Sequence, residues 1–254
     1  MTVKPRDTES RAHQPSYDPP PLPPISPRAE LAVLLRVLAA RGYDDLRAGH
    51  VTVGQPGGTI LINPRELCWP EVRAGDIVTI DGAGRKLAGR YNPTIAADIH
   101  LELRRARPDV GIIVHNHPHW SVVWGDCHRV PPIYDQTSAS IPEDLVLIDE
   151  YAGDFTGQDA AKRAAEAFGD AEWALLANHG VLVTGRSVAQ AFLRAYTLEW
   201  RAQRAWEVEV LGGGHPMDPD VARDYGRQFQ SATDGWWEAA MRMEITRDAS
   251  VLDE

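Results

Sequence analysis

The segment from Ile112 to Pro118, Ile-Ile-Val-His-Asn-His-Pro, constrains this chain more than any other. Its three β-branched apolar residues predict a buried strand. In an extended chain, residues two apart point to the same side, roughly 7 Å apart, so His115 and His117 share one face at the strand end. Pro118 then ends the strand pairing. Two imidazoles held in this way can bind one metal ion, and the alternative is two polar residues that only make hydrogen bonds.

A third histidine has similar surroundings. His179 lies in an Asn-His-Gly turn with apolar residues on both sides, and Gly180 permits a tight turn there. Three neutral imidazoles that leave one coordination position open are typical of a catalytic metal site. We therefore expect His115, His117 and His179 to bind one divalent ion. Zn is our first choice and Mn, Fe or Co are the alternatives, because imidazole suits most of these metals.

Several short motifs, taken in order, resemble the class II aldolase/adducin family. Residues 115–118 are similar to its H-x-H-[PS] motif, and residues 178–185 are similar to its Asn-His-Gly segment. Residues 99–110 resemble its helix and the Arg-Pro-Asp-Val link into the metal strand. Residues 49–53 and 62–64 resemble its Gly-[Asn/His]-[Ile/Val]-Ser-Val and Ile-[Asn/Thr]-Pro elements. The likeness runs from about residue 29 to 212, and motifs in the right order are far more specific together than singly.

The resemblance implies a fold and an assembly. The fold class is α/β, with three α/β/α layers around a central, largely antiparallel sheet. The sequence agrees, because its strands and helices do not alternate strictly. The assembly is a homo-tetramer with active sites at subunit interfaces. A long Ala-rich helix and eight tryptophans supply apolar surface that another subunit can cover.

The resemblance also implies a reaction class. The family includes sugar-phosphate aldolases, a thioribulose-phosphate dehydratase, aromatic-acid decarboxylases and the cytoskeletal protein adducin. In aldol cleavage and in decarboxylation, a divalent ion can act as a Lewis acid and stabilise the enolate left when a neighbouring bond breaks.

One departure from the family pattern narrows that class. Family aldolases carry Pro-Ser-Ser-Glu four residues before the helix histidine; the serines bind phosphate and the glutamate moves protons. Counting back from His100, this chain has Pro93-Thr94-Ile95-Ala96. An alanine methyl group cannot move a proton, and an isoleucine cannot donate to phosphate. Asp98 lies about 200° further round a regular helix than position 96, so it is a poor replacement. The pattern resembles the decarboxylase and adducin-like branches more closely.

We therefore predict a divalent-metal-dependent carbon–carbon lyase. Decarboxylation of a hydroxy- or oxo-carboxylate is slightly favoured. The alternatives are aldol cleavage of a non-standard substrate, an iron-dependent oxygen-using enzyme on the same fold, and a non-catalytic adducin-like binding module. The intact histidine set argues against the binding module, because a scaffold has no need of a metal ion.

With alanine at position 96, another residue has to move protons. The candidates are His50, which stands where many relatives have asparagine, His119, which follows the metal strand, and Tyr134, which follows a Pro-Pro pair. Each has a plain alternative as a loop or turn residue, and His100 is expected to support the site or the core. The candidate substrate-binding residues are Asn92, Thr94 and Arg90, with Arg65 and Arg201 as further guanidinium groups that could hold a carboxylate.

Composition limits the partners. The net charge of −10 argues against nucleic acid or an anionic membrane surface as a partner. The lyase activity that the resemblance implies predicts a small carboxylate or carbonyl compound as the substrate. Two cysteines are too few for a disulfide framework, and no apolar run approaches the ~20 residues of a spanning helix. The first residues show no apolar core of a signal peptide. We expect a cytoplasmic protein.

The proline run Pro19–Pro24 predicts that residues 1–25 form a disordered tail, and residues 26–254 form a single domain. Ser26 followed by Pro27 predicts a helix start. Helices are expected at 26–42, 95–106, 157–168, 187–210 and 218–243. Strands are expected at 50–53, 59–62, 76–80, 112–114, 145–149 and 173–176, and also near 129–134.

Overall fold

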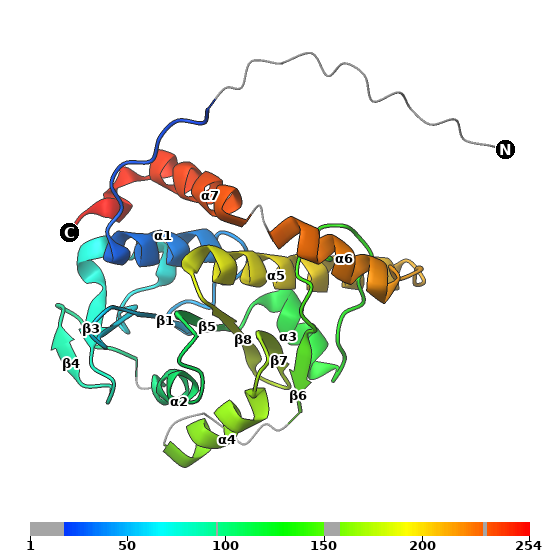
Figure 1. The fold of residues 1–254 in the computed structure, drawn as a ribbon, viewed down its shortest axis with the longest axis horizontal. Helices are drawn as coiled ribbons and strands as arrows, with labels where there is room; N and C mark the ends of the chain where they lie inside the picture. The colour runs from blue at the N-terminus through cyan, green and yellow to red at the C-terminus, as the bar shows by residue number, and fades with distance from the viewer. Residues whose placement is uncertain (1–17, 95, 150–157, 231–232) are drawn as a thin grey trace.

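An eight-stranded sheet forms the centre of the molecule (Figure 1). The computed structural model describes residues 18–94, 96–149, 158–230 and 233–254. The strands are β1 (His50–Gly54), β2 (Ile60–Ile62), β3 (Val78–Ile80), β4 (Lys86–Ala88), β5 (Ile112–Asn116), β6 (Val146–Ile148), β7 (Trp173–Leu176) and β8 (Gly180–Gly185). Their order is β4-β3-β2-β1-β5-β8-β7-β6, and only β6 and β7 run parallel. This confirms the predicted α/β class with a largely antiparallel sheet.

Helices cover both faces of the sheet (Figure 1). One side carries α1 (Pro27–Ala39), α5 (Val188–Val210) and α7 (Thr233–Arg247), and the other carries α2 (Asp98–Ala106) and α4 (Gln158–Phe168). The remaining α-helices are α3 (His119–Asp126) and α6 (Pro219–Phe229), and short 3₁₀ turns span Trp69–Glu71, Ala74–Asp76 and Ala249–Leu252. The Ser26 hydroxyl accepts from the Ala29 amide at the start of α1, as the Ser-Pro pair predicted.

Strand β5 shows how alternation positions the site. Ile112 and Val114 are buried in the core under α1 and α5, whereas Ile113 is buried in the core under α2 and α4. All three are fully buried, and each such side chain stabilises the fold by roughly 1.5–3 kcal/mol. Because side chains alternate along a strand, His115 follows Ile113 onto the α2 side. The core therefore fixes the direction of the first imidazole.

Several predicted elements differ from the structure. Residues 129–134 form no strand, because Pro131 and Pro132 have no N–H to donate to a sheet. The helix predicted at 218–243 is two helices, α6 and α7. Strand β4 was not predicted: all its side chains are exposed, so it lacks an alternating apolar pattern. Helix α2 begins at Asp98, whereas Ile95 lies outside the described residues.

The predicted tail is only partly within the described residues. Residues 18–25 have neither helix nor strand, as the prolines require. Leu22 nevertheless packs against the core that contains α1 and α5. This stretch is therefore part of the folded domain, and residues 1–17 lie outside the described part of the chain. Among the described helices, none has the length and apolar character needed to cross a membrane.

Candidate metal centre

Three histidines from two loops and a strand end converge on one point. One potential ligand nitrogen from each of His115, His117 and His179 lies within 4.8 Å of the other two. The ring centroids are 5.1 Å apart for His115 and His117, 4.8 Å for His115 and His179, and 5.0 Å for His117 and His179. The structure therefore brings together the three residues that the sequence predicted as ligands.

The backbone at the third histidine is specialised for this approach. Asn178 has a φ of 54°, a left-handed conformation that asparagine tolerates better than most residues. Gly180 follows, and a Cβ there would lie 2.5 Å from both the Asn116 carbonyl oxygen and the His117 ring carbon Cδ2. Only glycine lets the turn after β7 come this close to the end of β5. The Asn-His-Gly motif thus places His179 against His117.

Two of the imidazoles are held by partners on their outer nitrogens. His115 Nδ1 donates to the Val181 carbonyl at 2.9 Å, and His117 Nδ1 lies 2.7 Å from an Asp45 carboxylate oxygen that accepts its hydrogen. These bonds leave each Nε2 with a lone pair, which is the form a metal ligand needs. The Nε2 of His117 is buried and has no hydrogen-bond partner. A buried acceptor in this state fits a cation ligand.

The surroundings of His115 and His179 keep their rings neutral. Burial lowers the pKa of His115 well below its usual value, and the neighbouring imidazoles of His50, His179 and His117 lower it further. Burial, followed by repulsion from His117, lowers the pKa of His179 to about 4. Neutral imidazole is the ligand form for a divalent ion, so His115 and His179 need lose no proton to bind one near pH 7.

A hydrogen-bonded chain leads away from this centre toward α2. His50 pairs with His115 across β1 and β5, and the two ring centroids are 4.7 Å apart. His50 Nδ1 lies 2.8 Å from His100 Nε2, and His100 Nδ1 lies 2.8 Å from the Thr52 hydroxyl. Arg104 donates to that hydroxyl at 3.1 Å. Of the predicted proton carriers, His50 is the one that the structure places against a ligand ring.

The chemistry of its members sets the direction of this chain. The Arg104 guanidinium can only donate, so the Thr52 oxygen accepts from it. Thr52 is fully buried, and within the described residues His100 Nδ1 is the acceptor available for its hydroxyl hydrogen. Leaving that hydrogen without an acceptor would cost about 1–3 kcal/mol. His100 therefore carries its own hydrogen on Nε2 and donates it to His50 Nδ1.

It follows that His50 is a hydrogen-bond donor. With Nδ1 accepting, a neutral His50 carries its hydrogen on Nε2. Burial, together with the neighbouring histidines, lowers the pKa of His50 well below its usual value, so the neutral ring is the stable form. A nitrogen that carries hydrogen cannot ligate a metal. With this tautomer, His50 cannot serve as a fourth ligand to an ion held by the other three histidines.

The other two predicted proton carriers have different surroundings. His119 is exposed at the first residue of α3, with its ring edge-on to Trp120 at 4.8 Å. The Tyr134 hydroxyl lies 3.3 Å from a Glu209 carboxylate oxygen near the end of α5. Neither shows a ring or hydrogen-bond contact with His115 or His117 in the described part of the chain. Their catalytic roles remain predictions.

The predicted substrate-binding residues lie in the loop before α2. The Asn92 side chain donates to Glu66 at 2.7 Å, and the Arg90 guanidinium lies 5.4 Å from the Tyr91 ring centroid. The Thr94 hydroxyl accepts from the Ala96 amide at 3.4 Å. These contacts are local, so their binding of substrate also remains a prediction.

Sequence reasoning missed Asp45, Thr52 and Arg104. Asp45 carries no spacing signal, because it lies in an irregular loop far along the chain from its partner. Thr52 and Arg104 did carry a weak spacing signal. Thr52 shares a strand face with His50 at i+2, and Arg104 shares a helix face with His100 at i+4. A search for polar residues at those two spacings could have found both.

Comparisons with known proteins identify the family of this chain. The Class II Aldolase and Adducin N-terminal domain matches residues 29–206. A protein of Streptomyces roseochromogenus subsp. oscitans, named 4-hydroxy-3-prenylphenylpyruvate oxygenase/4-hydroxy-3-prenylbenzoate synthase, is 30% identical over 210 residues, 81% of this chain and 76% of its own. The 3,4-dihydroxyphthalate decarboxylase of Arthrobacter keyseri is 30% identical over 244 residues, 89% and 96% of the two chains.

The fold comparison points the same way. The structure of L-fuculose 1-phosphate aldolase from Glaciozyma antarctica PI12 superposes with a TM-score of 0.79 at 20% identity, covering 92% of this chain and 97% of that one. At this identity the likeness establishes a shared fold. The sequence match supplies the rest: this chain belongs to the class II aldolase and adducin family.

Proposed function

We propose that this protein is a divalent-metal-dependent carbon–carbon lyase that decarboxylates a small hydroxy- or oxo-carboxylate. The observation that carries the proposal is the group of three imidazoles with the outer nitrogens of two of them already bound, by Val181 and Asp45. Class II aldolases are divalent-metal enzymes, and lyases are among the relatives of this chain. Zn is our first choice of metal, with Mn, Fe or Co as alternatives.

His115, His117 and His179 would hold the ion. When bound, it would act as a Lewis acid that stabilises negative charge on a substrate oxygen as the carbon–carbon bond breaks. The Nε2–H group of His50 would donate a hydrogen bond to that oxygen, because the chain through His100 keeps the hydrogen of His50 on Nε2. This changes the predicted role of His50 from proton donor to hydrogen-bond donor, since neutral imidazole is a far weaker acid than imidazolium. The proton that replaces carbon dioxide would then come from water, His119 or Tyr134.

The substrate class follows from two features. Position 96 is alanine, so the site lacks the glutamate that aldolases of this family have there. Without that negative charge, a substrate carboxylate would meet less repulsion near the metal. The Arthrobacter relative is named for an aromatic dicarboxylate with two hydroxyl groups, one of them next to a carboxylate. We propose an aromatic or oxo acid with an oxygen near the leaving carboxylate. Asn92, Thr94 and Arg90 remain the proposed substrate-binding residues.

An oxygen-using reaction on the same three histidines is the second candidate. It is favoured by one observation, the name oxygenase carried by the Streptomyces relative. Decarboxylation needs no external oxidant, because the electron pair of the broken carbon–carbon bond stays on the substrate carbon, where a proton takes the place of carbon dioxide. An oxygenase consumes molecular oxygen. The two functions therefore differ in a simple requirement.

The test is carbon dioxide release by metal-loaded protein from a panel of aromatic hydroxy- and oxo-carboxylates, under nitrogen and under air. A decarboxylase releases carbon dioxide equally in both, whereas an oxygenase needs air and consumes oxygen. His115→Ala protein is the control and should lose both metal and activity. Cleavage of a sugar phosphate would instead support an aldolase. Wild-type protein that binds no metal would support the adducin-like binding module.

We also propose a homo-tetramer with active sites at subunit interfaces, in the cytoplasm. Exposed apolar side chains at Trp206, Val210 and Leu211 on and just after α5 support an interface, and Cys68 and Cys127 are both free thiols. Light scattering at micromolar concentration tests the assembly. A monomer would contradict it.

A further inference from the structure

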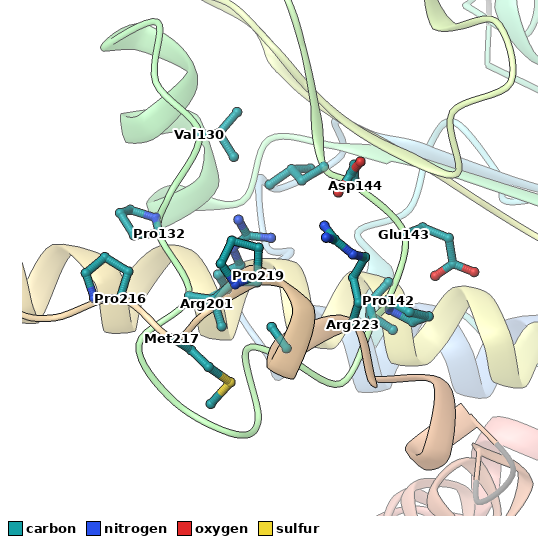
Figure 2. A pocket seen from close by; sticks show the side chains of 14 residues that line it. Val130, Pro132, Pro142, Glu143, Asp144, Arg201, Pro216, Met217, Pro219 and Arg223 are labelled. Atoms are coloured by element: carbon teal, nitrogen blue, oxygen red, sulfur yellow. The ribbon is translucent and has the colours of Figure 1, made fainter. Parts of the chain in front are cut away.

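One cavity of the molecule has none of the three imidazoles in its lining. Figure 2 shows this cavity, of about 370 Å³, between α5, the start of α6 and the segment that contains Val130 and Asp144. Its walls are mainly apolar and include Ile141, Leu145 and Met217, together with several prolines. Arg201 and Arg223 also line it. A small pocket with apolar walls and few polar groups is the usual form of a small-molecule site.

Arg201 is the unusual residue in this cavity. Its side chain is only 8% exposed, and its Nε donates to the Pro131 carbonyl at 2.8 Å. The guanidinium lies 5.9 Å from the Trp173 ring centroid. Burial lowers its pKa to about 10, which still leaves the group charged near pH 7. Its two terminal nitrogens, which carry four of the five N–H donors of a guanidinium, have no hydrogen-bond partner among the described residues. These donors belong to a largely buried cation that lines the cavity.

The neighbouring carboxylates do not satisfy this group. The Oε1 atom of Glu143 is held by Arg194 at 3.2 Å and by Gln230 at 2.9 Å, and its buried Oε2 has no hydrogen-bond partner in the described structure. Asp144 is exposed and forms no ion pair with Arg201 in the described structure, although its charge acts on that guanidinium. Arg223, the other cation of the cavity, is paired with Asp220. Arg201 is therefore the cation whose donors are available to a ligand.

We propose that this cavity binds a small monocarboxylate with an apolar body. The two terminal nitrogens of Arg201 match a carboxylate in the bidentate geometry that guanidinium favours. Ile141, Leu145 and Met217 would contact the hydrocarbon part. A volume of about 370 Å³ suits a single-ring aromatic or branched aliphatic acid. This site is independent of the metal centre, so it stands or falls apart from the proposed lyase reaction.

The test is calorimetric titration of the full-length protein with 3-phenylpropanoate and, separately, with 3-phenylpropan-1-ol. The two probes share their apolar body and differ in charge. We expect one carboxylate per chain, and binding of the alcohol at least tenfold weaker. Arg201→Met should weaken carboxylate binding by roughly 10- to 100-fold, the value of charge-assisted hydrogen bonds. Arg223→Gln is the matched control and should change it by less than about threefold.

The metal-centre variant separates this site from the first. His115→Ala protein should bind 3-phenylpropanoate as tightly as wild type. Loss of binding in that variant would place the probe at the imidazoles and overturn the proposal, while leaving the lyase reaction untouched. Equal affinity for acid and alcohol would also overturn it, and this comparison uses wild-type protein only. The proposal equally fails if folded Arg201→Met protein, checked by circular dichroism, retains wild-type affinity.

Discussion

Replacing Thr52 with valine tests the direction of the hydrogen-bonded chain behind the metal centre. The substitution keeps the side-chain shape and removes the hydroxyl that bonds His100 at 2.8 Å and Arg104 at 3.1 Å. Arg104 keeps its bonds to the Thr52 and Val110 carbonyls at 2.8 and 2.9 Å. One or two buried hydrogen bonds are lost, so we expect unfolding to become easier by about 1–2 kcal/mol, which leaves the protein folded.

The same change should alter the tautomer of His50. Without the hydroxyl, the Thr52 side chain no longer sets which nitrogen of His100 carries hydrogen. The preference for one His100 tautomer falls by about 1 kcal/mol, roughly a fivefold change in the ratio of the two tautomers. Part of the His50 rings would then carry hydrogen on Nδ1 and present a lone pair from Nε2. We expect turnover to fall about two- to tenfold. We also expect a bound metal to be held more tightly, because His50 would become able to ligate it.

The assay is ¹⁵N NMR of histidine-labelled, metal-free protein, which distinguishes a ring nitrogen that carries hydrogen from one that does not. Wild-type His50 should show hydrogen on Nε2, and Thr52→Val should show a mixture. Thr52→Ser keeps the hydroxyl and should resemble wild type in both tautomer and turnover. Hydrogen on Nδ1 of His50 in the wild-type protein would refute the reasoning outright. So would Thr52→Val and Thr52→Ser proteins with identical spectra.

Three further predictions concern the same site. Asp45→Asn should weaken metal affinity by roughly 10- to 100-fold in competition with a chelator, because the His117 ring loses its anionic partner, and unchanged affinity would remove Asp45 from the site. Burial holds the pKa values of His50 and His100 below the unfolded value near 6.5, so below that pH the unfolded chain binds more protons. The free energy of unfolding of metal-free protein should therefore be highest above pH 6.5 and fall between pH 6.5 and 5. A melting temperature that does not change over this range would contradict the buried neutral rings. Ala96→Glu should weaken the native reaction while the metal stays bound, since the added carboxylate would compete for the open position and repel an anionic substrate; cleavage of a ketose phosphate by this variant would restore the aldolase interpretation.

Local pattern was enough for the elements that carry the ligands. The β-branched run at Ile112–Val114 predicted a buried strand, and strand alternation placed His115 and His117 on one side of it. The Asn-His-Gly turn predicted the third imidazole, and the Ser26-Pro27 pair predicted the start of α1. Each of these features depends on residues within a few positions of one another, so the sequence records them directly.

Tertiary structure alone decided what surrounds those ligands. Asp45 is 72 residues from His117 and Thr52 is 48 residues from His100, and no local period connects such pairs. They meet because β1 pairs with β5 in the register that sets His50 opposite His115, and because α2 packs over that face of the sheet. The unused donors of Arg201 also appear only when α5 packs beside Pro131, in a segment that the sequence predicted as strand. Sheet register and helix packing depend on the apolar area that the whole core buries. Local sequence patterns show which face of each element is apolar, but they do not show which faces pack together.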